Sequence, residues 1–154
     1  MTPPRVSVVT ATRNRTELLE RTLRCIAAQK DVEFEAIISD DGSSAEVIAH
    51  HERLIADLGP RFSLLRRPGA DVQGTGPAAT RNRGIAAARA EFVAFLDDDD
   101  RWRGDRYLAD GVDALVAHGA DYAFGHLDGE REGRLQNPGW VPPARMWEGE
   151  TQVG

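Results

Sequence analysis

The chain has 154 residues, the length of one globular domain, of which 41% are hydrophobic and 29% are charged. Its net charge of −6 argues against general binding of nucleic acid or of anionic membranes. The single cysteine excludes an internal disulfide, and we find no apolar run long enough for a transmembrane segment, so we expect a cytoplasmic protein. The sequence leaves open whether the protein forms a homo-oligomer.

Apolar, β-branched stretches alternate along the chain with stretches whose apolar residues recur at helical spacing. The predicted strands are 5–10, 34–39, 62–65, 91–96 and 120–124, and the predicted helices are 15–29, 45–58, 77–90 and 105–118. Alternation of this kind predicts an α/β fold with a mainly parallel sheet over residues 1–124. Residues 125–154 lack periodicity and are expected to form an irregular tail, with a β-hairpin as one alternative.

Short polar signals mark the ends of several predicted helices. Asn14, followed three residues later by Glu17, is typical of a capping box at the start of the first helix. Ser44 is expected to cap the second helix, and Gly119 is expected to end the last one. The adjacent histidines at 50–51 have no second ligand at metal spacing, so we expect both on the surface of their helix.

Four consecutive aspartates, residues 97–100, follow the apolar strand predicted at 91–96. Neighbouring carboxylates repel one another, and burying them without compensation costs several kcal/mol. The carboxyl ends of strands are also where α/β sheets bind ligands. Since a hard divalent cation offsets such charge through oxygen ligands, the run predicts a Mg²⁺ or Mn²⁺ site that takes phosphates.

Residues 74–79 and the aspartate run at 97–100 each have a second interpretation. Residues 74–79 match the glycine pattern of a nicotinamide dinucleotide site, with Asp97 ending a strand farther along the chain. However, no strand runs directly into Gly74, and the additional carboxylates after Asp97 would repel a pyrophosphate. The aspartate run is also compatible with a solvated acidic turn, although the apolar strand before it favours a binding site.

Three segments together carry a family resemblance: VSVVTATRNR at 6–15, ISDDGSS at 38–44 and AATRNRGIAAARAEFVAFLDDDDRW at 78–102. In order and spacing they resemble the family 2 inverting glycosyltransferases, which use nucleotide-sugar donors. The resemblance implies the GT-A fold, a Rossmann-like α/β/α sandwich. It also implies a UDP-type donor sugar, an acceptor that the sequence does not identify, and Mn²⁺ or Mg²⁺ as the cofactor.

The resemblance also implies roles for individual residues. The residues expected to bind the nucleotide are Thr10, Ala11, Thr12, Arg13, Asp40, Asp41, Arg81, Asp97 and Asp98, and those expected to ligate the metal are Asp99 and Asp97. Asp40 and Asp41 would contact the base, and Arg81 would lie near the diphosphate or brace the site. Ala11 and Arg13 stand where the family has proline and an aromatic residue, so an arginine contact is expected to replace base stacking.

The family's catalytic base is an Asp or Glu in a second half of the domain, next to the acceptor. We expect residues 125–154 to be the start of that acceptor region, with the remainder missing from the chain. Glu148 and Glu150 are acidic, but nothing in their surroundings identifies either as the base. The alternative to an active glycosyltransferase is therefore a non-catalytic module that binds a nucleotide or nucleotide sugar.

Overall fold

The computed structural model describes residues 3–67, 74–125, 128–131 and 134–137. Its strands are β1 (Val6–Thr12), β2 (Phe34–Asp40), β3 (Phe62–Arg66), β4 (Phe92–Phe95), β5 (Gly129–Arg131) and β6 (Arg134–Asn137). Its helices are α1 (Glu17–Ala27), α2 (Ala45–Leu58), α3 (Pro77–Ala87) and α4 (Tyr107–His118). The first four strands form one sheet in the order β3-β2-β1-β4, and every neighbouring pair is parallel.

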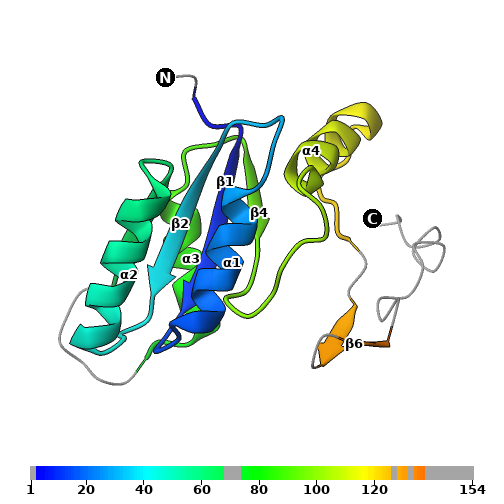
Figure 1. The fold of residues 1–154 in the computed structure, drawn as a ribbon. Coiled ribbons are helices and arrows are strands. Elements are labelled where there is room, and N and C mark those ends of the chain that lie inside the picture. Colours follow the sequence, from blue (N-terminus) through cyan, green and yellow to red (C-terminus); the bar gives the residue numbers. More distant parts are fainter. Residues whose placement is uncertain (1–2, 68–73, 126–127, 132–133, 138–154) are drawn as a thin grey trace, which may run out of the picture.

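Helices cover both faces of this sheet, which confirms the predicted Rossmann-like α/β/α arrangement. In Figure 1, α1 and α2 lie in front of the sheet and α3 lies behind it. Strands β1 and β2 are central, so six of seven residues in β1 and all seven in β2 are buried. This explains why both strands are mainly apolar, because a strand covered on both faces has no solvent side for regularly alternating polar residues.

The main hydrophobic core lies between the sheet and the two helices in front of it. Alternate residues of the central strands, such as Val8 and Ile38, point toward Leu19 and Leu23 of α1. The same core receives Leu54 from α2. Other members of the core include Val6, Ile26, Phe34, Ala36, Ile55, Phe62, Leu96, Leu108 and Val112. The opposite face packs closely against α3, where a Cβ on Gly84 would lie 2.4 Å from Val9 Cγ1.

A polar cluster fixes the amino ends of the two central strands. Ser7 of β1 donates a hydrogen bond of 2.7 Å to Glu35, its register partner in β2. Arg89, which follows α3, donates to both carboxylate oxygens of Glu35 through its backbone and side chain. Burial alone would raise the pKa of Glu35, but the contacts with Arg89 and Ser7 outweigh burial and lower it.

The strand predicted at 120–124 does not form. These residues carry no strand, and Tyr122 and Phe124 are 74% and 55% exposed. The prediction was wrong because β-propensity describes how well a side chain fits a paired, half-buried surface. Within the described residues this segment has no strand beside it, so aromatic content alone does not make it a strand.

The capping box predicted at Asn14 is also wrong. Helix α1 begins at Glu17 with Thr16 at the N-cap position, and no side chain caps it. Asn14 instead adopts φ of 50°, a left-handed conformation that asparagine tolerates better than most residues. From there its backbone N–H donates to Ser43 Oγ, and its Oδ1 accepts from Ser44, both at 2.8 Å. Asn14 thus joins two loops instead of starting a helix.

The other helix ends largely follow their predictions. Ser44 caps α2 by accepting from the backbone of Val47, and Gly119 ends α4 with φ of 59°. Helix α3 ends at Ala87 rather than at residue 90, and α4 begins at Tyr107 rather than at 105. No helix in the described part of the chain is long and apolar enough to cross a membrane.

The segment after α4 contains a small antiparallel pair, β5 with β6, in line with the β-hairpin alternative for the tail. Residues 138–154, and with them Glu148 and Glu150, lie outside the described residues. The division into a domain at 1–124 and a tail at 125–154 stays a prediction.

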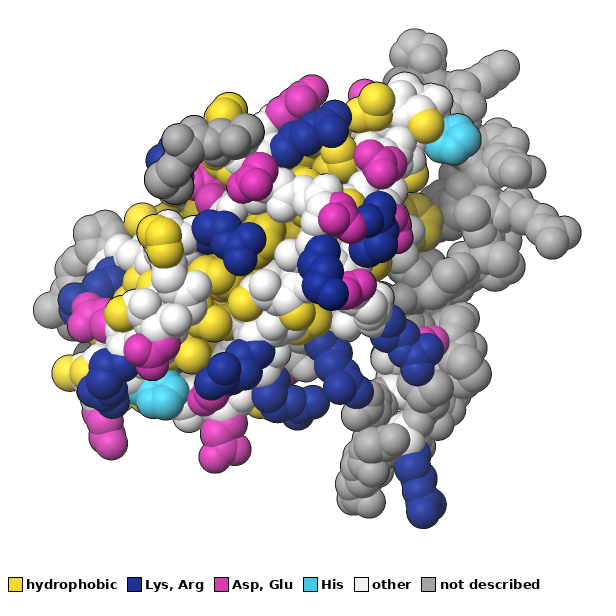
Figure 2. Space-filling view, turned by 45° about the horizontal axis from the view of Figure 1, so that its top comes forward, with side chains coloured by type: hydrophobic (Ala, Val, Ile, Leu, Met, Phe, Trp, Pro, Cys, Tyr) yellow, Lys and Arg dark blue, Asp and Glu magenta, His cyan; other side chains and the backbone are white. Residues whose placement is uncertain are grey.

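Acidic and basic side chains are interspersed over the face shown in Figure 2, so charge of one sign does not dominate that face.

Candidate functional site

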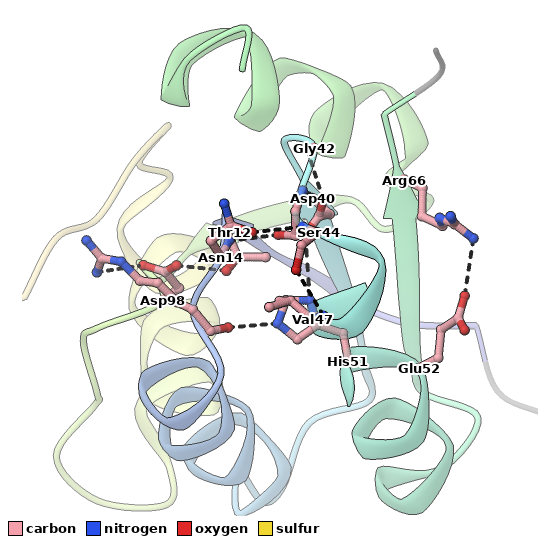
Figure 3. Close-up of polar contacts among 12 residues, drawn as sticks. Thr12, Asn14, Asp40, Gly42, Ser44, Val47, His51, Glu52, Arg66 and Asp98 are labelled. Atoms are coloured by element: carbon pink, nitrogen blue, oxygen red, sulfur yellow. Dashed lines mark hydrogen bonds and ion pairs between the residues drawn. The ribbon is translucent and has the colours of Figure 1, made fainter. Parts of the chain in front are cut away.

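Three loops meet at the carboxyl edge of the sheet: those after β1, β2 and β4. Parallel pairing aligns the ends of β1 and β2, so that Thr12 is the register partner of Asp40. The backbone N–H of Asp41 donates to the carbonyl of Thr12 at 3.0 Å. On the other side, the Thr12 hydroxyl donates to the carboxylate of Asp98 at 2.8 Å, as Figure 3 shows. Thr12 therefore joins the two acidic loops predicted to form one site.

Asp40 stabilises its own loop. Its side chain is 1% exposed, and its Oδ1 accepts from the backbone N–H groups of Gly42 and Ser43. Its Oδ2 accepts from Ser43 Oγ at 2.5 Å and lies 3.6 Å from His51 Nδ1. Burial would raise the pKa of Asp40, but His51, Ser43 and Gly42 outweigh burial and lower it. The carboxylate is thus ionised, and it is held by its own loop and by the nearby His51.

His51 is not on the surface, contrary to the prediction. It is 0% exposed and projects from α2 beneath the loops, with its Nε2 2.7 Å from the carbonyl oxygen of Arg15 (Figure 3). Burial would lower the pKa of His51, but Asp40 and the Arg15 carbonyl raise it above its ordinary value. Its neighbour His50 is only partly buried. The physical reason for the error is that Asp40 offers a buried histidine a partner, which helical periodicity cannot reveal.

Asp41 is held by the glycine-containing segment at 74–76. Its Oδ1 accepts from the backbone N–H and the hydroxyl of Thr75, at 2.9 and 2.6 Å, and its Oδ2 accepts from Gly76 N–H at 2.9 Å. Burial would raise the pKa of Asp41, but these hydrogen bonds outweigh burial and lower the pKa to about 2. The backbone donors that a dinucleotide site would aim at a pyrophosphate here bind an aspartate of the same chain.

Gly74 allows this segment to approach so closely. A Cβ at this position would lie 2.5 Å from Asp41 Oδ2 and 2.7 Å from Arg13 Nη1. Arg13 and the glycine segment therefore both lie next to the Asp41 carboxylate. Arg83 Nη2 also lies 3.6 Å from Asp41 Oδ1, so the Asp41 carboxylate is surrounded by donors of its own chain.

Arginines pair with the three aspartates predicted to face the diphosphate and metal. Arg15 Nη1 lies 2.5 Å from Asp99 Oδ2 and 3.2 Å from Asp98 Oδ1. Arg81 of α3 lies 2.5 Å from Asp97 Oδ1, at the acidic loop. Asp98 is buried, and burial together with the charges of Asp99 and Asp97 raises its pKa.

The donor set of this loop fits a hard divalent cation only in part. Asp97 and Asp99 offer carboxylate oxygens, the ligand type that Mg²⁺ and Mn²⁺ prefer, and both side chains are 47% exposed. Within the described residues, no group of three or more His, Cys, Asp or Glu side chains could hold a metal ion. One or two carboxylates do not complete an octahedral shell, so phosphate oxygens and water would have to supply the other ligands.

The remaining predicted residues occupy the end of β1. Thr10 is 1% exposed with an unpaired hydroxyl, whereas Ala11 is only partly buried. The prediction omitted Arg15, His51 and Arg83, which also belong to the site. Arg83 donates to the carbonyl of Asp40 and to the hydroxyl of Thr75, so it bridges two of the loops. The RNR sequence at 81–83 could have indicated Arg83, but the prediction included only Arg81, the first arginine of that sequence.

Comparison with known proteins gives the same family as the motifs. The family model for Glycosyl transferase family 2 matches residues 7–143. The GalNAc(5)-diNAcBac-PP-undecaprenol beta-1,3-glucosyltransferase of Campylobacter jejuni is 32% identical over 136 residues, or 86% of this chain and 41% of that protein. The poly(ribitol-phosphate) beta-N-acetylglucosaminyltransferase TarP of Staphylococcus aureus is 31% identical, covering 84% of this chain and 38% of that protein. The chain spans less than half the length of either relative.

Solved structures with this fold include enzymes bound to nucleotide sugars. The mannosyltransferase PcManGT from Pyrobaculum calidifontis, in complex with GDP-Man and Mn²⁺, superposes with a TM-score of 0.63 at 26% identity. S. aureus TarS 1–349, in complex with UDP-GlcNAc, gives a TM-score of 0.63 at 25% identity. Each match covers 75% of this chain, and it covers 33% of the first chain and 32% of the second.

Proposed function

We propose that this chain, which belongs to glycosyl transferase family 2, binds the donor in a metal-dependent glycosyltransferase. The donor is a nucleotide sugar of the UDP type, and the sugar passes with inversion to an acceptor hydroxyl. Support comes from S. aureus TarS, solved with UDP-GlcNAc, and from PcManGT, solved with GDP-Man and Mn²⁺.

One observation carries the proposal: the loops after β1, β2 and β4 are tied together at one sheet edge through Thr12. A nucleotide diphosphate placed along this edge would have its base beside Asp41 and its phosphates beside residues 97–99. The exposed carboxylates of Asp97 and Asp99 are the oxygen ligands that a phosphate-bound cation requires.

We assign different roles toward the base to Asp40 and Asp41, which follow one another at the end of β2. Asp41 lies at the glycine segment close to Arg13, so we assign it the contact with an imide N–H of the uracil type. Asp40 is 1% exposed and accepts from Gly42 and Ser43 within its own loop, so we assign it the support of that loop and no direct contact with the base. Arg13 lies beside Asp41 and is assigned the stacking or polar contact that the family's aromatic residue would make.

The two arginines at the acidic loop would change partners when the donor arrives. Arg15 and Arg81 now offset the charge of Asp97, Asp98 and Asp99. A bound Mn²⁺ or Mg²⁺ would supply positive charge that offsets the charge growing on the departing diphosphate. The arginines would then be released to pair with phosphate oxygens, for which a guanidinium is well suited.

Calorimetry on the intact chain tests this function. We expect UDP to bind, GDP and TDP to bind more weakly, and Mn²⁺ to strengthen the binding of UDP. In Asp99→Ala the Mn²⁺ effect should disappear because a metal ligand is lost. Asp100→Ala is the matched control, since it removes the same charge from the adjacent, exposed residue and should keep the Mn²⁺ effect.

Two results would contradict the proposal in different ways. Failure of UDP, GDP and TDP to bind at millimolar concentration would remove the nucleotide site itself. Equal Mn²⁺ effects in the native chain and in Asp99→Ala would leave the nucleotide site but remove the assigned metal ligand. Incubation with UDP-sugars and analysis of the products by mass spectrometry then separates a transferase from a module that only binds the donor.

A further inference from the structure

A buried ionic pair, His51 with Asp40, lies directly beneath the candidate donor site. The two side chains are 0% and 1% exposed, and neither contacts the reacting groups in the function proposed above. Burying two ionisable groups is costly unless they are paired and hydrogen-bonded.

Both ring nitrogens of His51 face oxygen atoms. Nε2 lies 2.7 Å from the backbone carbonyl of Arg15, and a carbonyl can only accept, so Nε2 must carry a proton. Nδ1 lies 3.6 Å from a carboxylate oxygen of Asp40 and has no hydrogen-bond partner. A lone pair facing a carboxylate would be repelled, so a second proton is favoured there. The geometry corresponds to an imidazolium between two acceptors.

These contacts connect all three loops of the site. The Arg15 carbonyl belongs to the β1–α1 loop, and Asp40 belongs to the β2–α2 loop. The guanidinium of the same Arg15 reaches Asp98 and Asp99 in the β4–α4 loop. In Figure 3, His51 extends from α2 below Asp40, and a dashed line joins its ring to the carbonyl oxygen of Arg15.

We propose that His51 is a positioning residue for the donor site: by bridging the Arg15 carbonyl and Asp40, it sets the relative position of the loops that bind the base and the diphosphate. This inference rests on the proposed function. It assigns to a buried histidine a role in affinity for the nucleotide in addition to its role in folding. Besides Asp40, the ionisable groups near the ring are Asp98, whose charge favours the protonated form, and the adjacent His50.

The first experiment compares three variants by calorimetry with UDP and by thermal unfolding. His51→Leu removes both contacts, and we expect its affinity for UDP to fall about tenfold. His51→Gln can still donate one hydrogen bond to the Arg15 carbonyl, so it should recover part of the affinity. The matched control, His50→Leu, changes the preceding residue of the same helix and should bind UDP like the native chain.

A second measurement does not depend on whether His51→Leu folds. The titration of each histidine in the native chain is followed by NMR with and without uridine, which binds the base subsite and carries no phosphate charge. If protonated His51 favours the binding arrangement, reciprocity requires uridine to raise the midpoint of its titration. The midpoint of His50 should not move.

The outcomes separate this inference from the function on which it rests. If the native chain binds no nucleotide, both are wrong. If the native chain binds UDP, and a folded His51→Leu binds it equally well, only the positioning role is wrong. An unchanged His51 midpoint in the presence of bound uridine would overturn the positioning role in the same way.

Discussion

The hydrogen bonds that hold Asp41 predict a measurable dependence of stability on charge. Its pKa falls from 3.8 to about 2 because three donors from the glycine segment outweigh the effect of burial. At about 1.4 kcal/mol for each pKa unit, the ionised carboxylate contributes about 2 kcal/mol to the free energy of unfolding near neutral pH. Because the folded-state pKa is the lower one, this contribution is present above pH 4 and is lost as the pH falls toward 2.

Asp41→Asn removes the charge and leaves an amide that cannot accept from all three donors. We expect urea unfolding at pH 7 to show that the variant's free energy of unfolding is about 2 kcal/mol lower than that of the native chain. At pH 3 this difference in free energy should be smaller by about 1 kcal/mol. Asp57→Asn, at an exposed position of α2, is the control and should change stability little. A difference in free energy of unfolding below about 0.5 kcal/mol at pH 7 would refute this reasoning. The same conclusion would follow if the difference were equal at pH 7 and pH 3.

Two further predictions concern packing and the acidic loop. Gly84→Ala should destabilise the fold by about 1–3 kcal/mol in urea unfolding, because the new Cβ would overlap Val9 Cγ1. In Gly111→Ala the new Cβ would meet nothing within 4 Å, so this variant should be more stable than the native chain by about 0.5–1 kcal/mol. A change in the free energy of unfolding in the same direction for both variants would contradict this packing. Arg15→Ala should bind Mn²⁺ more tightly without nucleotide, measured by calorimetry, because Asp99 loses its competing partner. Unchanged Mn²⁺ affinity would contradict that competition.

The fold and the meeting of the acidic loops could be predicted from local patterns. The segments at 6–12 and 34–40 are mainly apolar because both faces of the strands are buried, and short polar segments follow them. Since parallel strands align their carboxyl ends, Asp41 and the aspartates after β4 had to lie at one edge. These conclusions need only the order and type of elements, which periodicity reveals well.

The polar connections could not be predicted, because they join residues far apart in the chain. Thr75 holds Asp41 across 34 positions, and Arg15 reaches Asp99 across 84. The residues next to Asp41 and Asp99 in the sequence do not indicate that Thr75 and Arg15 are their partners. His51 is the instructive case: it lies three residues after Ile48, on the buried face of α2. The prediction placed His51 on the surface because the residue type favours it, and the carboxylate partner that stabilises it in the interior lies in another segment of the chain.

The cluster of Ser7, Glu35 and Arg89 at the amino ends of the strands has a consequence for how the domain tolerates change. Its ionic contacts fix the register of β1 against β2 at the end opposite the donor loops. Substitutions in those loops would therefore leave the register of β1 against β2 unchanged, because the contacts that set it lie at the opposite end of the strands. A library randomised at the carboxyl edge should retain many folded members with altered nucleotide preference, whereas the same diversity at the amino edge should yield few.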